Sequence, residues 1–261
     1  LSTMYSNSDR ETKLQATKFL ENFQKSQEAW TVAHEILNDD SETLEVRLFG
    51  AQTWRSKITY DLAQIPDSSL FQLKDSVLQT LLKYNNPNMK IIRTQMCVAL
   101  SQLALQFLPW DNALQEITTK LSGDQNIYCL LDFLKIMPEE LSDVKRSSLT
   151  DEEFNQRTKK LIVENVEQVL MLLNNMATSS NNVTLNSSIL DCLNSWIKEC
   201  PVESVLTIQL LTNLIFLSLT EDTTFEKSVE CLCTILNETK DLDNYELINA
   251  LYEQILNLNI L

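Results

Sequence analysis

The residues Thr43–Leu62 read TLEVRLFGAQTWRSKITYDL, and the residues Pro87–Leu108 read PNMKIIRTQMCVALSQLALQFL. In the first stretch, apolar side chains recur at helical spacing, and two large aromatic residues widen the stripe: Leu44, Leu48, Ala51, Ile58 and Leu62, with Phe49 and Trp54. The second stretch leaves only a narrow polar face, which indicates a helix packed on several sides. A third helical pattern, Ser68–Tyr84, lies between them. Long helices joined by short polar turns are typical of a helical solenoid.

Similar apolar stripes continue through the rest of the chain, separated by short polar or proline-containing turns. We expect Ser8 or Asp9 to cap a first helix that runs to about Ser26. Gly123 fits the position after a helix end, where a positive φ is common. The pattern predicts an all-α fold without strands, namely a HEAT-repeat superhelical solenoid of about six antiparallel helix pairs that occupies residues 1–261.

Capping residues and prolines predict several helix ends. The acidic turn Asn38–Ser41 is expected to cap the helix over Thr43–Leu62. One helix is expected to end at Met137, before a proline, and unbroken patterns predict single helices over Glu152–Met176 and Pro201–Leu219. Three pairs have the spacing of a capping box: Thr150 with Glu153, Thr223 with Glu226, and Asp243 with Glu246.

The composition limits the possible classes of protein. The chain carries 36 acidic and 21 basic residues, which gives a formal net charge of −15. This charge argues against non-specific binding to nucleic acid or anionic membranes and favours basic partners. Only 2 of the 261 residues are glycine, too few for the tight turns of an all-β fold or for a glycine-rich nucleotide loop. No apolar run of about 18 residues is present, so we expect no transmembrane helix.

The residues that usually carry catalysis are scarce. His34 is the only histidine, which leaves almost no material for histidine-based acid–base chemistry or metal clusters. We interpret His34 as an ordinary helix position. The carboxylate runs Glu139–Glu140 and Asp151–Glu153 are interpreted as helix caps and exposed charge. The sequence therefore predicts no enzyme, no cofactor and no metal site.

The cysteines and tryptophans lie in or beside apolar stripes. The six cysteines are expected to be buried free thiols. Cys231 and Cys233 are two positions apart, so they point to different helix faces and do not form a metal-binding pair. For the four tryptophans, core packing is favoured over a peptide-binding role: Trp30, Trp54, Trp110 and Trp196.

The segment Phe49–Ile58, FGAQTWRSKI, resembles the second HEAT repeat of importin-β-type transport receptors. Further segments resemble the transportin-SR type, most closely its fungal form, in the family's order and spacing: Lys74–Leu78, Gln95–Leu108 with Trp110, Ile136–Glu140, Cys192–Trp196, Pro201–Glu203 and Val229–Cys233. The sequence departs from the family's pattern in two ways. The family's first helix is missing or reduced to its end at Leu1, and full receptors are several times longer than this chain. The resemblance implies an N-terminal fragment or partial chain of a longer receptor.

The resemblance also implies binding of Ran in its GTP-bound form, within about residues 1–140. The family uses the inner helices of its first repeats for Ran, and these correspond here to Asp9–Lys25, Thr43–Leu62 and Pro87–Leu108. On these helices we expect six polar side chains to contact Ran: Lys18, Gln52, Arg55, Lys57, Gln95 and Gln102. The alternative is that these side chains are solvated or pair with one another inside the solenoid.

Further partners are implied by the same resemblance. They are arginine/serine-rich or other basic cargo proteins, for which the family largely uses later repeats, and the FG repeats of the nuclear pore. The implied receptor shuttles between cytoplasm and nucleus, and this part of it contacts neither membrane nor nucleic acid directly. A second interpretation of the helical pattern is a HEAT-type protein–protein scaffold with no GTPase partner. Binding of Ran loaded with GTP or with GDP distinguishes the two.

Overall fold

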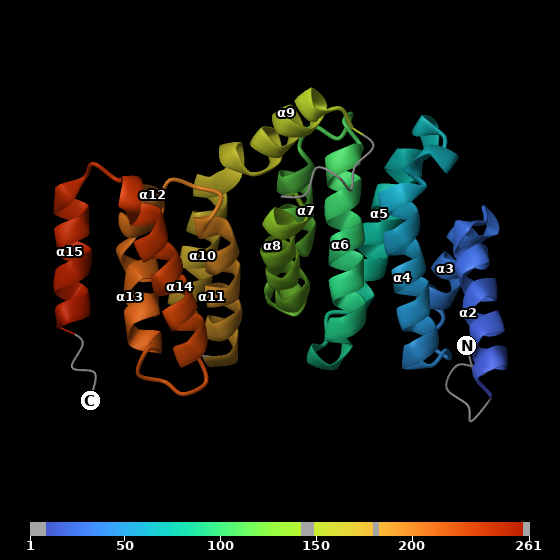
Figure 1. Cartoon of the computed structure of the whole chain (residues 1–261), viewed down its shortest axis with the longest axis horizontal. Coiled ribbons are helices and arrows are strands. Elements are labelled where there is room, and N and C mark those ends of the chain that lie inside the picture. The colour runs from blue at the N-terminus through green and yellow to red at the C-terminus, as the bar shows by residue number, and fades with distance from the viewer. Residues whose placement is uncertain (1–8, 142–148, 180–182, 258–261) are drawn as a thin grey trace. The chain divides into compact units, whose positions relative to one another are not determined.

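The computed structural model describes residues 9–141, 149–179 and 183–257. Helices are the only regular secondary structure of these residues, which confirms the all-α prediction (Figure 1). None of the helices in these ranges is long and apolar enough to cross a membrane. The chain divides into two compact units, Leu1–Thr158 and Lys159–Leu261, and α9 (Asp151–Leu161) runs across the boundary.

The first unit is built from helices in two layers (Figure 1). One layer contains α2 (Arg10–Lys25), α4 (Leu44–Tyr60), α6 (Lys90–Gln106) and α8 (Ile127–Leu141). The other contains α3 (Glu28–Asn38), α5 (Asp67–Lys83) and α7 (Ala113–Leu121), with short 3₁₀ turns at Leu62–Gln64, Pro87–Met89 and Asp124–Asn126. Helices α3, α5 and α7 each pack on the helix that follows, and α6 packs between α4 and α8. Sequential helix pairs of this kind are HEAT-like, as the sequence predicts.

The second unit is also helical. It contains the 3₁₀ turn Val163–Asn165 and the helices α10 (Val166–Ser179), α11 (Val183–Ile197), α12 (Val202–Leu206), α13 (Gln209–Ser218), α14 (Phe225–Glu238) and α15 (Tyr245–Leu256). Helix α11 packs against α10 and α14, and α13 packs against the same two helices. Trp196 of α11 is fully buried, and Cys231 of α14 donates its thiol hydrogen to the Leu190 carbonyl at 3.2 Å. This unit therefore has a core of its own.

Two N-terminal caps show how the first helices begin. Asp9 caps α2 as predicted, since its carboxylate accepts a hydrogen bond from the Thr12 backbone N–H at 2.8 Å. The predicted cap of α4 is wrong by a few residues: the Thr43 hydroxyl accepts from the Val46 N–H at 3.4 Å. The Asp39 carboxylate is used within the preceding turn, where the Ser41 hydroxyl donates to it at 2.6 Å and lowers its pKa.

Among the predicted capping boxes, only the one that opens α9 is confirmed. The Thr150 backbone N–H and hydroxyl donate to the Glu153 carboxylate at 3.0 and 2.7 Å, and they lower its pKa. Helix α14 instead begins after Thr224, whose hydroxyl donates to the Ser218 carbonyl at 3.0 Å. Helix α15 is capped by Asn244, which accepts from the Leu247 N–H at 3.3 Å. In both helices the N-cap residue lies one position after the predicted one, and only Asn244 caps with its side chain.

Three predicted helix boundaries are also corrected. Helix α8 continues through Pro138 to Leu141, because both residues are buried in the core. The expected helix over Glu152–Met176 is broken after Leu161, where the Asn165 amide donates to the Lys160 carbonyl at 2.8 Å. The expected helix over Pro201–Leu219 is divided into α12 and α13.

The predicted core role of the tryptophans is confirmed. All four are at most 7 % exposed. The Trp54 indole N–H donates to the Trp30 carbonyl at 3.1 Å, so it is satisfied inside the core. The cysteine prediction holds for four of the six free thiols, whereas Cys200 is partly exposed and Cys233 is exposed. Burial raises the pKa of the Cys129 and Cys231 thiols to about 12.

A buried arginine fastens α9 to the end of α6. The Arg157 guanidinium donates to the Ala104 carbonyl at 2.9 and 2.7 Å, and to the Trp110 carbonyl at 2.8 Å. These bonds satisfy carbonyls at and just beyond a helix C-terminus, which have no partner within the helix. Burial lowers the pKa of Arg157, and the hydrogen bonds to these carbonyls offset part of the cost of burying its charge.

Replacing Arg157 with methionine is expected to lower the free energy of unfolding by about 2–3 kcal/mol, because hydrogen bonds to a charged donor are lost and buried carbonyls are left without a partner. Urea denaturation followed by circular dichroism measures this change. The control is Arg10→Met, at an exposed position, with an expected change within about 0.5 kcal/mol. Equal midpoints for the two variants would contradict the assignment.

Candidate partner-binding site

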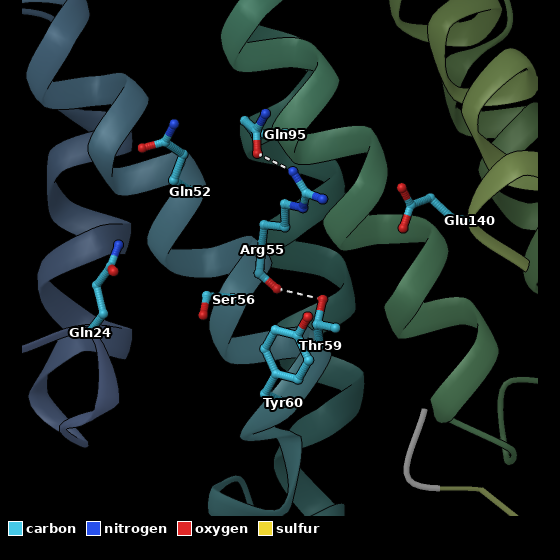
Figure 2. Close-up of a pocket in the computed structure, with 8 residues that line it drawn as sticks. All are labelled: Gln24, Gln52, Arg55, Ser56, Thr59, Tyr60, Gln95 and Glu140. Carbon is cyan, nitrogen blue, oxygen red and sulfur yellow. Dashed lines mark hydrogen bonds between the residues drawn. The ribbon is translucent and has the colours of Figure 1, made fainter. Parts of the chain in front are cut away.

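A polar hollow of about 360 Å³ opens in the α2/α4/α6/α8 layer of the first unit (Figure 2). Its lining comes from all four helices: Gln24 of α2; Gln52, Arg55, Ser56, Thr59 and Tyr60 of α4; Gln95 of α6; and Glu140 of α8. We call this site the polar hollow. Its position in the layer of α2, α4 and α6 is the one that the resemblance implies for a partner surface.

Helix α4 supplies most of the lining because of its periodicity. The five lining residues are spaced i, i+3, i+4, i+7 and i+8 along the helix, which places them on one face. Trp54 and Ile58 point elsewhere and are buried. The same helix therefore presents a polar stripe to the hollow and packs its remaining faces into the core.

Arg55 is the cation of the polar hollow. Its Nη1 donates to the Gln95 side-chain oxygen at 3.0 Å, across the gap between α4 and α6 (Figure 2). The Arg55 backbone carbonyl accepts from the Thr59 hydroxyl at 2.8 Å. No carboxylate of the described residues lies within ion-pair distance of Arg55, whose side chain is partly exposed. The guanidinium thus retains donors for a partner.

The other walls of the hollow are held by amide side chains. The Gln24 amide donates to the Thr53 hydroxyl at 3.0 Å and joins α2 to α4. The Gln102 amide donates to the Glu140 carboxylate at 3.3 Å and joins α6 to α8. Each of these contacts links two of the four helices that line the hollow.

The structure brings three of the six predicted contact residues together. Gln52, Arg55 and Gln95 all line the polar hollow, whereas Lys18 lies on α2, exposed and outside the lining. The two others need correction: Lys57 and Gln102 are both 0 % exposed and have no surface for a partner. They pair within the solenoid, as the alternative interpretation has it.

Three oxygen acceptors surround the buried ammonium group of Lys57. Its ammonium donates to the Gln64 side-chain oxygen at 2.6 Å, to the Asp61 carboxylate at 3.0 Å and to the Lys25 carbonyl at 3.3 Å. It also lies 5.5 Å from the centre of the Trp30 ring, within the range of a cation–π contact. Lys57 therefore joins the C-terminal end of α2 to α4.

The structure adds five lining residues that the sequence prediction missed: Gln24, Ser56, Thr59, Tyr60 and Glu140. Three of them belong to the α4 stripe, and the periodicity from Gln52 and Arg55 could have identified them. Tyr60 is the aromatic side chain of the lining, and 71 % of its surface is exposed. Gln24 and Glu140 depend on helix packing and have no local signal.

The lining has the chemistry of a binding surface. Amides, hydroxyls, one guanidinium and one carboxylate can recognise a polar partner by hydrogen bonds and charge. His34 lies outside the hollow, where its ring stacks on Trp54 at 5.4 Å between centroids. In the described ranges, no group of three or more His, Cys, Asp or Glu side chains could hold a metal ion.

Comparison with known proteins identifies the class. Residues 16–83 match the importin-beta N-terminal domain, and residues 89–232, more than half of the chain, match the exportin 1-like protein family. The chain therefore belongs to the importin-β family of nuclear transport receptors and covers the N-terminal region of that family. Receptors of this family are not enzymes.

The chain is similar to fungal and plant proteins. It is 42 % identical over 98 % of its length to the mRNA transport regulator MTR10 of Saccharomyces cerevisiae, and 38 % identical over 99 % to an uncharacterised protein of Schizosaccharomyces pombe. It is 27 % identical over 92 % to transportin MOS14 of Arabidopsis thaliana. The chain spans 27 %, 28 % and 25 % of these three relatives.

Proposed function

We propose that the chain is the N-terminal HEAT-repeat array of a nuclear import receptor, and that the part within about residues 1–140 binds Ran in its GTP-bound form. The proposal rests on the overlap between a family match and the residues that line the polar hollow. The match to the importin-beta N-terminal domain, residues 16–83, contains the whole α4 stripe of the polar hollow. Ran is expected to contact this stripe and the exposed Lys18 on α2.

The proposal extends to the whole receptor. In this proposal the whole receptor imports arginine/serine-rich or other basic proteins, passes the nuclear pore by binding its FG repeats, and shuttles between cytoplasm and nucleus. The names of two relatives, a transport regulator and a transportin, support a transport role. The net charge of −15 in this part supports a basic cargo, because opposite charge favours association.

A nucleotide-dependent pull-down tests the Ran proposal. The chain is immobilised and offered Ran loaded with GTP or with GDP at equal concentration. We expect the GTP form to bind at least about tenfold more tightly, a difference of about 1.4 kcal/mol. Equal binding of the two forms, or no binding, would overturn the proposal and favour a HEAT-type scaffold with no GTPase partner.

Replacing Tyr60 with alanine is expected to weaken binding of GTP-bound Ran by about tenfold or more. Tyrosine is enriched among the residues that dominate interface energies, and this ring lies exposed beside the polar hollow. The matched control is Tyr245→Ala in the second unit, because Tyr245 is 74 % exposed and Tyr60 is 71 % exposed. Surface plasmon resonance measures both variants. A similar loss for both would remove Tyr60 from the site.

A further inference from the structure

Arg55 differs from three buried cations of the first unit in the side chain that it is bonded to. Lys57 is paired with Asp61 at 3.0 Å, and Arg93 is paired with Asp132 at 2.6 Å. Lys74 is paired with Glu116. Each of these three cations is neutralised by a carboxylate of the same chain, and each is buried.

The side chain that holds Arg55 carries no charge. The Gln95 oxygen accepts from only one of the guanidinium nitrogens, at 3.0 Å, and Figure 2 shows the second terminal nitrogen pointing away from Gln95. An amide fixes the orientation of the guanidinium without cancelling its charge. The carboxylate of the lining, Glu140, accepts a hydrogen bond from the Gln102 amide at 3.3 Å.

We propose that Arg55, oriented by Gln95, is the socket for an aspartate or glutamate side chain of the protein that docks on the polar hollow. This inference rests on the proposed function, so the partner that carries the carboxylate is GTP-bound Ran. Arginine presents a planar fork of donors that matches a carboxylate in two parallel hydrogen bonds. Gln95 is a positioning residue, because it acts on the partner through Arg55.

The orientation of Arg55 has an energetic consequence. A long side chain that is already fixed loses less conformational freedom when its partner binds. Docking over the hollow also removes water from the pair, which strengthens the attraction between the charges relative to an exposed rim contact. The socket therefore contributes to both affinity and selectivity: an apolar or basic side chain in place of the carboxylate gives the guanidinium no acceptor, and a neutral amide or hydroxyl gives it no opposite charge.

The sharpest test is Gln95→Glu. This change keeps the size of the side chain and the acceptor next to Arg55 but adds a negative charge, so Arg55 becomes paired within the chain like Arg93. We expect the Kd for GTP-bound Ran to rise by about tenfold or more, as for Arg55→Ala. The double variant should lose no more than about twofold beyond the stronger single variant, because both changes remove the same contact.

Two matched controls separate the socket from general charge. Gln209→Glu makes the same chemical change in the second unit, where Gln209 is exposed, and Lys240→Ala removes a cation there. Both are expected to keep the wild-type Kd within about twofold. Affinity should also fall as salt rises for the wild type, and less steeply for Arg55→Ala, because salt screens the charge pair. If Arg55 had only a structural role, the dependence of affinity on salt concentration would be the same for the wild type and for Arg55→Ala.

The outcomes are distinguishable. If the wild type binds GTP-bound Ran selectively but Gln95→Glu and Arg55→Ala stay within about twofold of it, the socket is wrong and the proposed function stands. If Gln95→Glu weakens binding and Arg55→Ala does not, the added charge acts directly and the socket is again wrong. If the wild type does not bind GTP-bound Ran, the proposed function and the socket both fail. Circular dichroism of each variant checks that helicity is unchanged.

Discussion

Replacing Lys57 with glutamate is expected to destabilise the first unit by about 3–5 kcal/mol, the cost of an uncompensated buried charge. The new carboxylate would face the acceptors that surround Lys57, all of them oxygen atoms: Lys25 O, Asp61 Oδ2 and Gln64 Oε1. It would also lie beside the negative charge of Asp61. Urea denaturation followed by tryptophan fluorescence measures the loss, because Trp30 lies against the Lys57 ammonium.

Two further variants show that burial is the cause. Lys57→Met removes the charge without adding an anion, and Asp61 is partly exposed and can be hydrated, so the expected loss is about 1–3 kcal/mol. Lys18→Glu makes the same charge reversal at an exposed position and should change stability by no more than about 0.5 kcal/mol. If Lys57→Glu were as stable as Lys18→Glu, the side chain would be accessible, and a direct Ran contact by Lys57 would return as an interpretation.

Replacing Trp196 with alanine is expected to cost the second unit about 3–5 kcal/mol, the range for removing a buried large aromatic side chain. Trp196 is 0 % exposed and lies on α11, which packs against α10 and α14. The loss combines the transfer free energy of the indole with the cavity that it leaves. Trp196→Phe retains most of the apolar contact and should lose clearly less.

The loss at Trp196 should be local before it is global. Repeats in a solenoid are stabilised mainly by their neighbours, so amide hydrogen exchange is expected to accelerate in α11 and α14 while α4 and α6 stay protected. Hydrogen exchange with mass spectrometry resolves these segments. Uniform acceleration through both units, or an unchanged melting temperature, would contradict the core role of Trp196.

The sequence was sufficient for the helical architecture. Apolar residues at a 3.6-residue period identify a helix from local information alone, and this is why the helices around Trp54 and Met96 could be predicted. The burial of all four tryptophans follows from the same stripes, because a large apolar side chain on a packed face has no favourable exposed position.

Helix ends were harder to predict, because contacts distant in sequence decide them. A proline usually ends a helix, yet α8 continues past Pro138 because the following turn buries Leu141. The break after Leu161 occurs inside an unbroken apolar pattern, where the Asn165 side chain takes the place of a backbone donor. Neither feature has a signal within its own few residues.

At the candidate site, too, some features could be predicted from the sequence and others depended on the tertiary structure. Arg55 and Lys57 lie two positions apart on one predicted helix, and from the sequence alone both were predicted to be cations on the partner-binding surface. The two positions are about 200° apart around an α-helix, and only the packing of α2 and α6 on α4 decides which side meets solvent. Arg55 is turned to the polar hollow, next to Gln95, and Lys57 is turned to the end of α2, where oxygen acceptors enclose it. Helical periodicity, a property of consecutive residues, was thus determined by the sequence itself, whereas the environment of each charge depended on neighbours that only the tertiary structure supplies.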